Sequence, residues 1–275
     1  MTGFPSKSKR FFGIGYGIAL AAGTLALTLT LALAFEASVA FASPAANKPE
    51  IVKLTLTAAG QTRTLWLFVP AAPSATPAPR PLIVLLHGSG RNGESLIKPW
   101  KDLAEKEGIV LAAPDSTDSV HWTSPADGPG FLKDVVDAVS ARTPIDSRRV
   151  YLFGHSAGAV FALQMAAFES EYFAACAIHA GSLHADYLTT FDWAKRKIPF
   201  AIWIGTRDAF FPLDDVRATR DALRTRGFPL EYTEIPGHTH DYYASAKEIN
   251  PAVWSFFQEH PLAADPKFTV YGDTK

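Results

Sequence analysis

The stretch that decides the fold is residues 149–158, Arg-Val-Tyr-Leu-Phe-Gly-His-Ser-Ala-Gly, which runs directly into AVFALQMAAF at residues 159–168. Its first five residues are typical of a buried strand, and the run that follows is rich in helix-forming residues. Gly154 and Gly158 leave room for a sharp turn between the two, because glycine carries no Cβ. The sequence therefore predicts a strand–turn–helix elbow with Ser156 at its tip.

On both sides of this elbow, short apolar runs alternate with longer amphipathic stretches. Such alternation is typical of a parallel sheet with crossover helices. The predicted strands are residues 51–57, 63–69, 82–86, 109–113, 150–153, 174–178, 200–204 and 230–235, and the predicted helices are residues 97–107, 131–141, 157–170, 213–226 and 244–260. The first two strands are predicted to form an antiparallel hairpin. We expect an α/β fold with about eight strands in a mostly parallel sheet and helices on both faces.

The N-terminal segment has the layout of a secretory signal. Three basic residues precede an uncharged stretch rich in Ala, Leu, Gly and Thr at residues 11–35, and an A-x-A peptidase site ends at Ala42. We therefore expect a signal peptide at 1–42, export to the periplasm or the medium, and one catalytic domain at 43–275. The alternative is an uncleaved membrane anchor, because an apolar run of about 20 residues can span a bilayer.

Composition narrows the classes of partner. The 26 Lys and Arg residues nearly balance the 27 Asp and Glu residues, so no global field favours nucleic acid, and membrane contact is expected only through an uncleaved N-terminus. The single cysteine, Cys176, lies in a predicted buried strand and has no partner within the chain for a disulfide. His238 and His240 lack a third ligand at metal-binding spacing, so no metal site is expected.

Ser156 has the sequence context of an activated nucleophile. A serine hydroxyl needs a rigid support, a base, and two backbone N–H groups that stabilise the oxyanion of the intermediate. The first donor is predicted to be Ala157, directly after the nucleophile. The second is predicted to be Ser89, in the loop His87-Gly88-Ser89-Gly90 that follows strand 82–86. His87 itself is expected to hydrogen-bond this loop.

The acid and the base are expected in the loops after two later strands. Asp208 follows strand 200–204, whereas the competing Asp214 and Asp215 begin the next helix and suit its N-terminus. The loop after strand 230–235 offers two histidines. We favour His240, four residues past the proline that ends the strand, and His238 remains the alternative base.

The motifs together resemble a known group of proteins. They are Leu86-His87-Gly88, the elbow at 146–158, Gly205-Thr206-Arg207-Asp208, and the His238/His240 loop before Trp254-Ser255-Phe256-Phe257. They resemble exported α/β-hydrolases of the polyhydroxybutyrate depolymerase and feruloyl esterase type, with carboxylesterases and dienelactone-hydrolase-like proteins nearby. The resemblance implies hydrolysis of a small-molecule or polymer-derived carboxylic ester through an acyl-enzyme, without a metal or organic cofactor. Ser89 stands where depolymerase-like members typically have cysteine, which argues against polymer depolymerisation.

Three aromatic residues are candidates for substrate contact. Trp122 lies in the loop 115–130 that is expected to overhang the nucleophile, although it could equally pack that loop onto the domain. Phe210 and Tyr242 neighbour the predicted acid and base. Two other functions remain open: a serine peptidase on the same fold, which the short chain argues against, and a non-catalytic binding protein, which would be expected to lack part of the triad.

Overall fold

The computed structural model describes residues 49–71 and 78–269. The predicted signal peptide, residues 1–42, lies outside them. None of the helices in the described part of the chain has both the length and the apolar character needed to cross a membrane.

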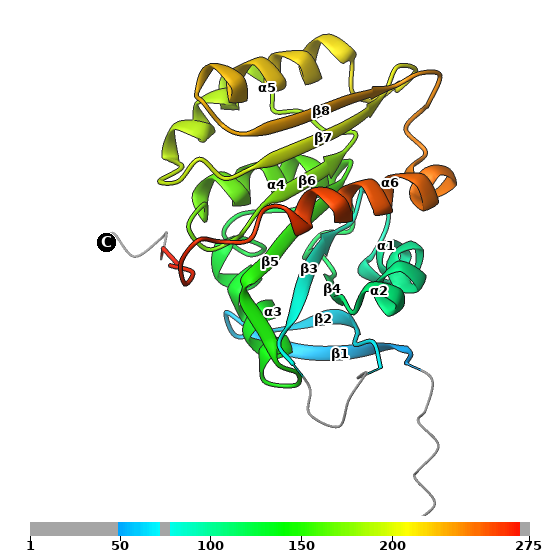
Figure 1. Cartoon of the computed structure of the whole chain (residues 1–275), viewed down its shortest axis with the longest axis vertical. Coiled ribbons are helices and arrows are strands. Elements are labelled where there is room, and N and C mark those ends of the chain that lie inside the picture. The colour runs from blue at the N-terminus through cyan, green and yellow to red at the C-terminus, as the bar shows by residue number, and fades with distance from the viewer. Residues whose placement is uncertain (1–48, 72–77, 270–275) are drawn as a thin grey trace, which may run out of the picture. The chain divides into compact units, whose positions relative to one another are not determined.

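The described residues form one eight-stranded sheet. Its strands are β1 (Ile51–Ala58), β2 (Gln61–Phe68), β3 (Arg80–Leu86), β4 (Val110–Pro114), β5 (Ile145–His155), β6 (Cys176–His179), β7 (Phe200–Gly205) and β8 (Leu230–Ile235). They lie in the order β1-β2-β4-β3-β5-β6-β7-β8 (Figure 1). β1 and β2 pair antiparallel, β2 pairs antiparallel with β4, and all other pairs are parallel. The predicted hairpin and mostly parallel sheet are therefore confirmed.

Helices cover both faces of the sheet, because successive side chains of a strand point to opposite faces. The helices are α1 (Gly93–Ile97), η1 (Lys98–Trp100), α2 (Lys101–Glu107), α3 (Pro129–Ser140), α4 (Ala157–Phe168), η2 (Ala185–Trp193), α5 (Leu213–Thr225) and α6 (Tyr242–Gln258), where η marks a 3-10 helix. Val84 and Leu152 pack with residues of α3 and α4, whereas Leu85 and Phe153 pack with residues of α1 and α6. Figure 1 shows these helices around the sheet. Each face therefore has its own apolar core.

The predicted helix 97–107 is wrong in detail. The structure has α1, η1 and α2 in its place, and Pro99 lies in the first turn of η1. A proline has no backbone N–H to donate and clashes with the preceding turn, so it disfavours a continuous α-helix here, although α6 accommodates Pro251 within its length. Asn92 begins α1 instead, and its side chain accepts a hydrogen bond from the backbone N–H of Ser95.

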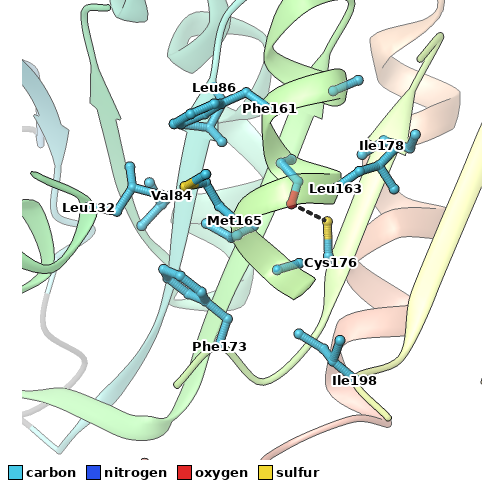
Figure 2. Close-up of a cluster of buried hydrophobic side chains, with 14 of the residues drawn as sticks. Val84, Leu86, Leu132, Phe161, Leu163, Met165, Phe173, Cys176, Ile178 and Ile198 are labelled. Carbon is cyan, nitrogen blue, oxygen red and sulfur yellow. Dashed lines mark hydrogen bonds between the residues drawn. The ribbon is translucent and has the colours of Figure 1, made fainter. Parts of the chain in front are cut away.

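The helix behind the nucleophile, α4, is buried against the sheet. Figure 2 shows Phe161, Leu163 and Met165 of this helix in the apolar cluster. Cys176 of β6 lies beside them, fully buried, with its Sγ 3.7 Å from the carbonyl oxygen of Ala162 (Figure 2). Burial raises the pKa of the Cys176 thiol, which keeps it protonated and unreactive. The core thus fixes α4, the helix that begins directly after Ser156.

Candidate active site

Ser156 lies at the turn between β5 and α4, in a backbone conformation with φ 57° and ψ −121°. Non-glycine residues rarely adopt a positive φ, so the surrounding contacts must hold it. A Cβ on Gly154 would lie 2.3 Å from the carbonyl oxygen of Gly158, and one on Gly158 would lie 2.0 Å from that of Leu86. Both positions therefore require glycine for the elbow to close.

A hydrogen-bonded row joins Ser156, His240 and Asp208. His240 Nε2 lies 2.9 Å from Ser156 Oγ, and His240 Nδ1 lies 2.8 Å from Asp208 Oδ2. The Asp208 side chain is fully buried, and its other oxygen accepts hydrogen bonds from the backbone N–H groups of Phe210 and Phe211 at 2.8 and 2.9 Å. Because a carboxylate only accepts, Nδ1–H donates to Asp208 and Nε2 is free to accept the serine proton.

His238, the alternative base, lies elsewhere. Its Nε2 is 2.9 Å from Nε2 of His179, and its Nδ1 is 3.3 Å from the hydroxyl of Ser245. Its backbone crosses the end of β7, where a Cβ on Gly205 would lie 2.2 Å from the His238 carbonyl oxygen. The structure thus brings His240, and not His238, to the predicted nucleophile.

The loop after β3 runs directly beside the nucleophile. A Cβ on Gly88 would lie 3.0 Å from Cβ of Ser156. In the described part of the chain, the backbone N–H groups of Ser89 and Ala157 have no hydrogen-bond acceptor. The Ser89 hydroxyl donates to the carbonyl oxygen of Val120 at 2.6 Å, which ties this loop to the next one. Ser89, next to Gly88, and Ala157, next to Ser156, therefore both adjoin the nucleophile with unused N–H groups.

His87 and Trp122 brace this loop from behind. His87 Nε2 accepts a hydrogen bond from the backbone N–H of Ser116 at 3.1 Å, so its Nδ1–H donates to the Gly88 carbonyl at 2.9 Å. Burial lowers the pKa of His87, in agreement with a neutral ring. Trp122 Nε1–H donates to the His87 carbonyl at 2.8 Å, and its ring stacks on Phe161 at 5.2 Å.

Two clefts flank Ser156. The larger, of about 370 Å³, is bordered by His240, His155 and Tyr243, with the Arg91 guanidinium 4.8 Å over the Tyr243 ring. The smaller, of about 210 Å³, lies beside Ala157 and is lined by Trp122, Val160 and Phe161 among others. Trp122 therefore both packs its loop and lines a cleft.

The other two predicted substrate contacts differ in outcome. Tyr242 is fully buried, and its hydroxyl donates to the side-chain oxygen of Asn250 at 2.6 Å. It cannot touch a bound substrate, which corrects the expectation, and the adjacent Tyr243 lines the cleft in its place. Phe210 is 73% exposed, with its ring centre 4.7 Å from that of His240, so its contact with substrate stays a prediction.

A larger cavity of about 620 Å³ lies away from these groups. Its walls include the β1–β2 turn at Ala59, Phe131 at the start of α3, Phe168 at the end of α4, and Trp193 of η2. None of the predicted site residues is among its described walls. Over residues 49–71 and 78–269, no group of three His, Cys, Asp or Glu side chains is arranged to hold a metal ion.

Sequence reasoning missed three residues at the site: His155, His179 and Arg91. His155 ends β5 and His179 ends β6, so both lie at the carboxyl edge of the sheet, where ligands bind in open α/β folds. Their position at strand ends was the available signal. Arg91 follows the predicted oxyanion loop by one residue and had no local pattern to single it out.

Comparison with known proteins assigns the chain to a family of hydrolases. Residues 112–265, more than half of the 275-residue chain, match the dienelactone hydrolase family. Poly(3-hydroxyalkanoate) depolymerase C of Paucimonas lemoignei is 34% identical over 122 residues, which are 40% of this chain and 30% of that protein. The chain spans less than half the length of the curated relatives it matches.

Solved structures share the fold. S-formylglutathione hydrolase (FrmB) of Staphylococcus aureus is similar with a TM-score of 0.63 and 15% identity, over 76% of this chain and 99% of that one. A ferulic acid esterase is similar with a TM-score of 0.62 and 16% identity, over 77% of this chain and 98% of that one. The sheet order and these neighbours identify the α/β-hydrolase fold. By the match over residues 112–265, this chain belongs to the dienelactone hydrolase family.

Proposed function

We propose that this chain is an exported serine hydrolase that cleaves carboxylic esters through an acyl-enzyme. Ser156 is the nucleophile, His240 the base and Asp208 the acid. The observation that carries the proposal is their hydrogen-bonded row, with distances of 2.9 and 2.8 Å. A histidine between a hydroxyl and a buried carboxylate is the arrangement that activates serine for attack on a carbonyl. Membership of a hydrolase family supports the same conclusion.

In the first half of the reaction, His240 Nε2 takes the proton of Ser156 as Oγ attacks the ester carbonyl carbon. The negative charge moves to the carbonyl oxygen, where the N–H groups of Ala157 and Ser89 donate to it. Asp208 stabilises the imidazolium that forms. The intermediate then expels the alcohol, which takes the proton from His240, and the acyl group stays on Ser156.

In the second half, a water molecule replaces the alcohol in the larger cleft. His240 Nε2 removes a proton from the water as its oxygen attacks the acyl carbon of the acyl-enzyme. The same two N–H groups stabilise the second oxyanion. The intermediate releases the carboxylic acid, and Ser156 regains its proton from His240.

The clefts support a small substrate. The 210 Å³ cleft has apolar walls at Trp122 and Phe161 and adjoins the Ala157 donor, so we assign it to a short acyl chain. The 370 Å³ cleft has polar walls at Arg91 and Asp241 and adjoins His240, so we assign it to the alcohol and to the hydrolytic water. A small-molecule ester or the end of a polymer-derived oligomer fits this division.

Hydrolysis of short p-nitrophenyl esters tests the proposal. Ser156→Ala is expected to lower kcat by at least about 10³-fold, because the nucleophile is lost. The matched control is Ser140→Ala at the exposed end of α3, which is expected to keep wild-type turnover. Unchanged turnover in Ser156→Ala, or no turnover by the wild-type enzyme with acetyl, butyryl and feruloyl esters, would refute the proposal.

Separate His240→Ala and His238→Ala variants test the choice of base. We expect the loss in His240→Ala to be the greater by at least about tenfold, because a general base contributes about 10²–10⁴-fold. Equal losses, or a greater loss in His238→Ala, would reverse the assignment.

Export is proposed on the layout of residues 1–42 alone. Expression of the full chain in a bacterial host, followed by mass spectrometry of the periplasmic fraction, is expected to give a protein that begins at Ser43. A full-length protein recovered only with membranes would instead indicate an uncleaved anchor.

A further inference from the structure

Three histidines that the proposed reaction does not use lie in a hydrogen-bonded row behind the catalytic site. His155 and His179 are buried, with 5% and 0% exposure, and their Nδ1 atoms lie 3.1 Å apart. His179 Nε2 lies 2.9 Å from Nε2 of His238, whose Nδ1 lies 3.3 Å from the Ser245 hydroxyl. A bond between two imidazole nitrogens needs one donor and one acceptor, so each contact holds a single proton.

The backbone carbonyl of His179 determines which nitrogen donates in each hydrogen bond of the row. His155 Nδ1 lies 3.4 Å from the carbonyl oxygen of His179, which can only accept, so Nδ1 carries the proton. His179 Nδ1 then accepts from His155, which leaves the proton of His179 on Nε2. That Nε2–H donates to His238 Nε2, and the remaining proton of His238 lies on Nδ1, toward Ser245. All three rings are neutral in this arrangement.

The surroundings favour neutral rings. Burial lowers the pKa of His155 to about 4 and that of His179 to about 2, with the neighbouring histidines adding to the effect. His240 and Arg91 also lower the pKa of His155, whereas the carboxylate of Asp208 and the backbone carbonyl of His179 raise it. A second proton on His179 or His238 would place two donors against each other at a nitrogen–nitrogen contact.

The row connects the two segments that must meet for catalysis. His155 precedes Ser156 in the chain, and its ring centre lies 5.0 Å from that of His240. The carbonyl of His179 accepts the backbone N–H of Ser156 at 3.1 Å. His238 precedes His240 by two residues and reaches past the end of β7 to β6. The three rings therefore join the end of β5, the end of β6 and the loop after β8.

We propose that His155, His179 and His238 are positioning residues, a one-way chain of neutral imidazoles that sets the distance between Ser156 and the loop of His240. The inference rests on the proposed function for its effect on turnover, since the distance matters only if His240 serves Ser156. The geometry of the chain itself can be tested without any turnover.

Two substitutions at His238 test whether its hydrogen bond to His179 matters, because only one of them can keep that bond. Glutamine extends to about where Nε2 of histidine lies and can still accept from His179, whereas asparagine reaches only to the Nδ1 position, toward Ser245. We expect His238→Asn to lower kcat on p-nitrophenyl acetate by roughly 30–100-fold with KM within about threefold, because about 1 Å of misplacement costs about 10²-fold. His238→Gln is expected to stay within about threefold of wild type. Equal kcat values for the two variants would overturn the proposal.

His179 gives the complementary pair, because both of its nitrogens are used. His179→Asn can keep only the contact to His155, and His179→Gln only the contact to His238. Each is expected to lower kcat by at least about tenfold, since either break disconnects the elbow from the base loop. Wild-type kcat in either folded variant would contradict a continuous chain.

Nitrogen-15 NMR of the imidazoles in the unmodified protein tests the row directly. We expect Nδ1–H tautomers for His155 and His238 and an Nε2–H tautomer for His179, with His155 and His179 neutral down to about pH 5. Titration of His155 or His179 near the ordinary value of about 6.5, or the reverse tautomers, would overturn the proposal. If the wild-type protein lacks esterase activity but shows these tautomers, the proposed function fails and the row stands.

Discussion

Replacing Gly205 by alanine tests how closely the base loop must lie against the sheet. A Cβ at this position would stand 2.2 Å from the carbonyl oxygen of His238 and 2.8 Å from that of Thr239. Ordinary contacts begin at 3.4 Å, so the loop and the end of β7 must separate by about 1.2 Å, the difference between 3.4 and 2.2 Å. A methyl group has no alternative rotamer, and the atoms it meets belong to the backbone, so only a shift of the chain relieves the contact.

The shift acts on catalysis through His240, two residues after His238. Its Nε2 lies 2.9 Å from Ser156 Oγ, and a separation of about 1 Å more would break this hydrogen bond. Misplacement by about 1 Å lowers a rate by about 10²-fold, which corresponds to about 2.7 kcal/mol in the barrier. Gly205 lines neither cleft, so we expect the loss in kcat, with KM changed by less than about threefold.

Steady-state hydrolysis of p-nitrophenyl acetate, with circular dichroism to verify folding, measures this loss. The matched control is Gly130→Ala in α3, where a Cβ meets nothing within 4 Å and φ is not positive. Its kcat is expected to equal that of wild type. A folded Gly205→Ala protein with wild-type kcat would show that the position of this loop does not set the rate, and would refute the reasoning.

Three further predictions concern other contacts. Asp208→Asn is expected to lower kcat by about 10³–10⁴-fold while leaving the fold intact, because an amide cannot hold the His240 tautomer; a loss below about tenfold in steady-state assays would exclude this role. Trp122→Phe keeps the stacking on Phe161 but leaves the His87 carbonyl without its donor, so urea unfolding should show a loss of about 1–2 kcal/mol with an unchanged m value. Burial raises the pKa of Glu169 to about 7, so the folded state holds a proton that the unfolded chain releases from about pH 4.5 upward, and stability falls as the pH rises through about 7. The free energy of unfolding of Glu169→Gln is therefore expected to exceed that of wild type by about 1–3 kcal/mol at about pH 8. This difference is expected to disappear near pH 4.5. Parallel pH dependences of stability for the two proteins would argue against a buried, protonated Glu169.

Most of the fold could be predicted from the sequence because its signals are local. All eight predicted strands appear, since fully buried parallel strands such as β3 and β7 are continuous apolar runs bounded by polar or turn residues. The helix before β4 was predicted as one piece because the period of its apolar residues continues through Pro99. There Pro99 lies in the first turn of the 3-10 helix η1, which the spacing of apolar residues does not distinguish from an α-helix.

The candidate site could likewise be predicted only in part from the sequence. Ser156 and Asp208 follow strands that the sequence marks clearly, so their meeting at one edge of the sheet could be expected. The sequence favoured His240 by its spacing from the end of the strand but left His238 open, because both lie in one short loop and the deciding contact, the crossing over Gly205, is between distant segments. The row of His155, His179 and His238 joins residues 24 and 59 positions apart, a distance at which local patterns carry no information.

The buried thiol of Cys176 has a practical consequence for site-specific labelling of this protein. Its sulfur is packed inside the apolar cluster and its protonated state is favoured, so thiol-directed reagents have no target on the folded chain. With the rest of the sequence free of cysteine, a cysteine introduced at the exposed Phe210 would be a single attachment point for a fluorophore beside the catalytic cleft. The chain is in this respect a ready background for spectroscopy, and no disulfide within the chain has to form while it folds.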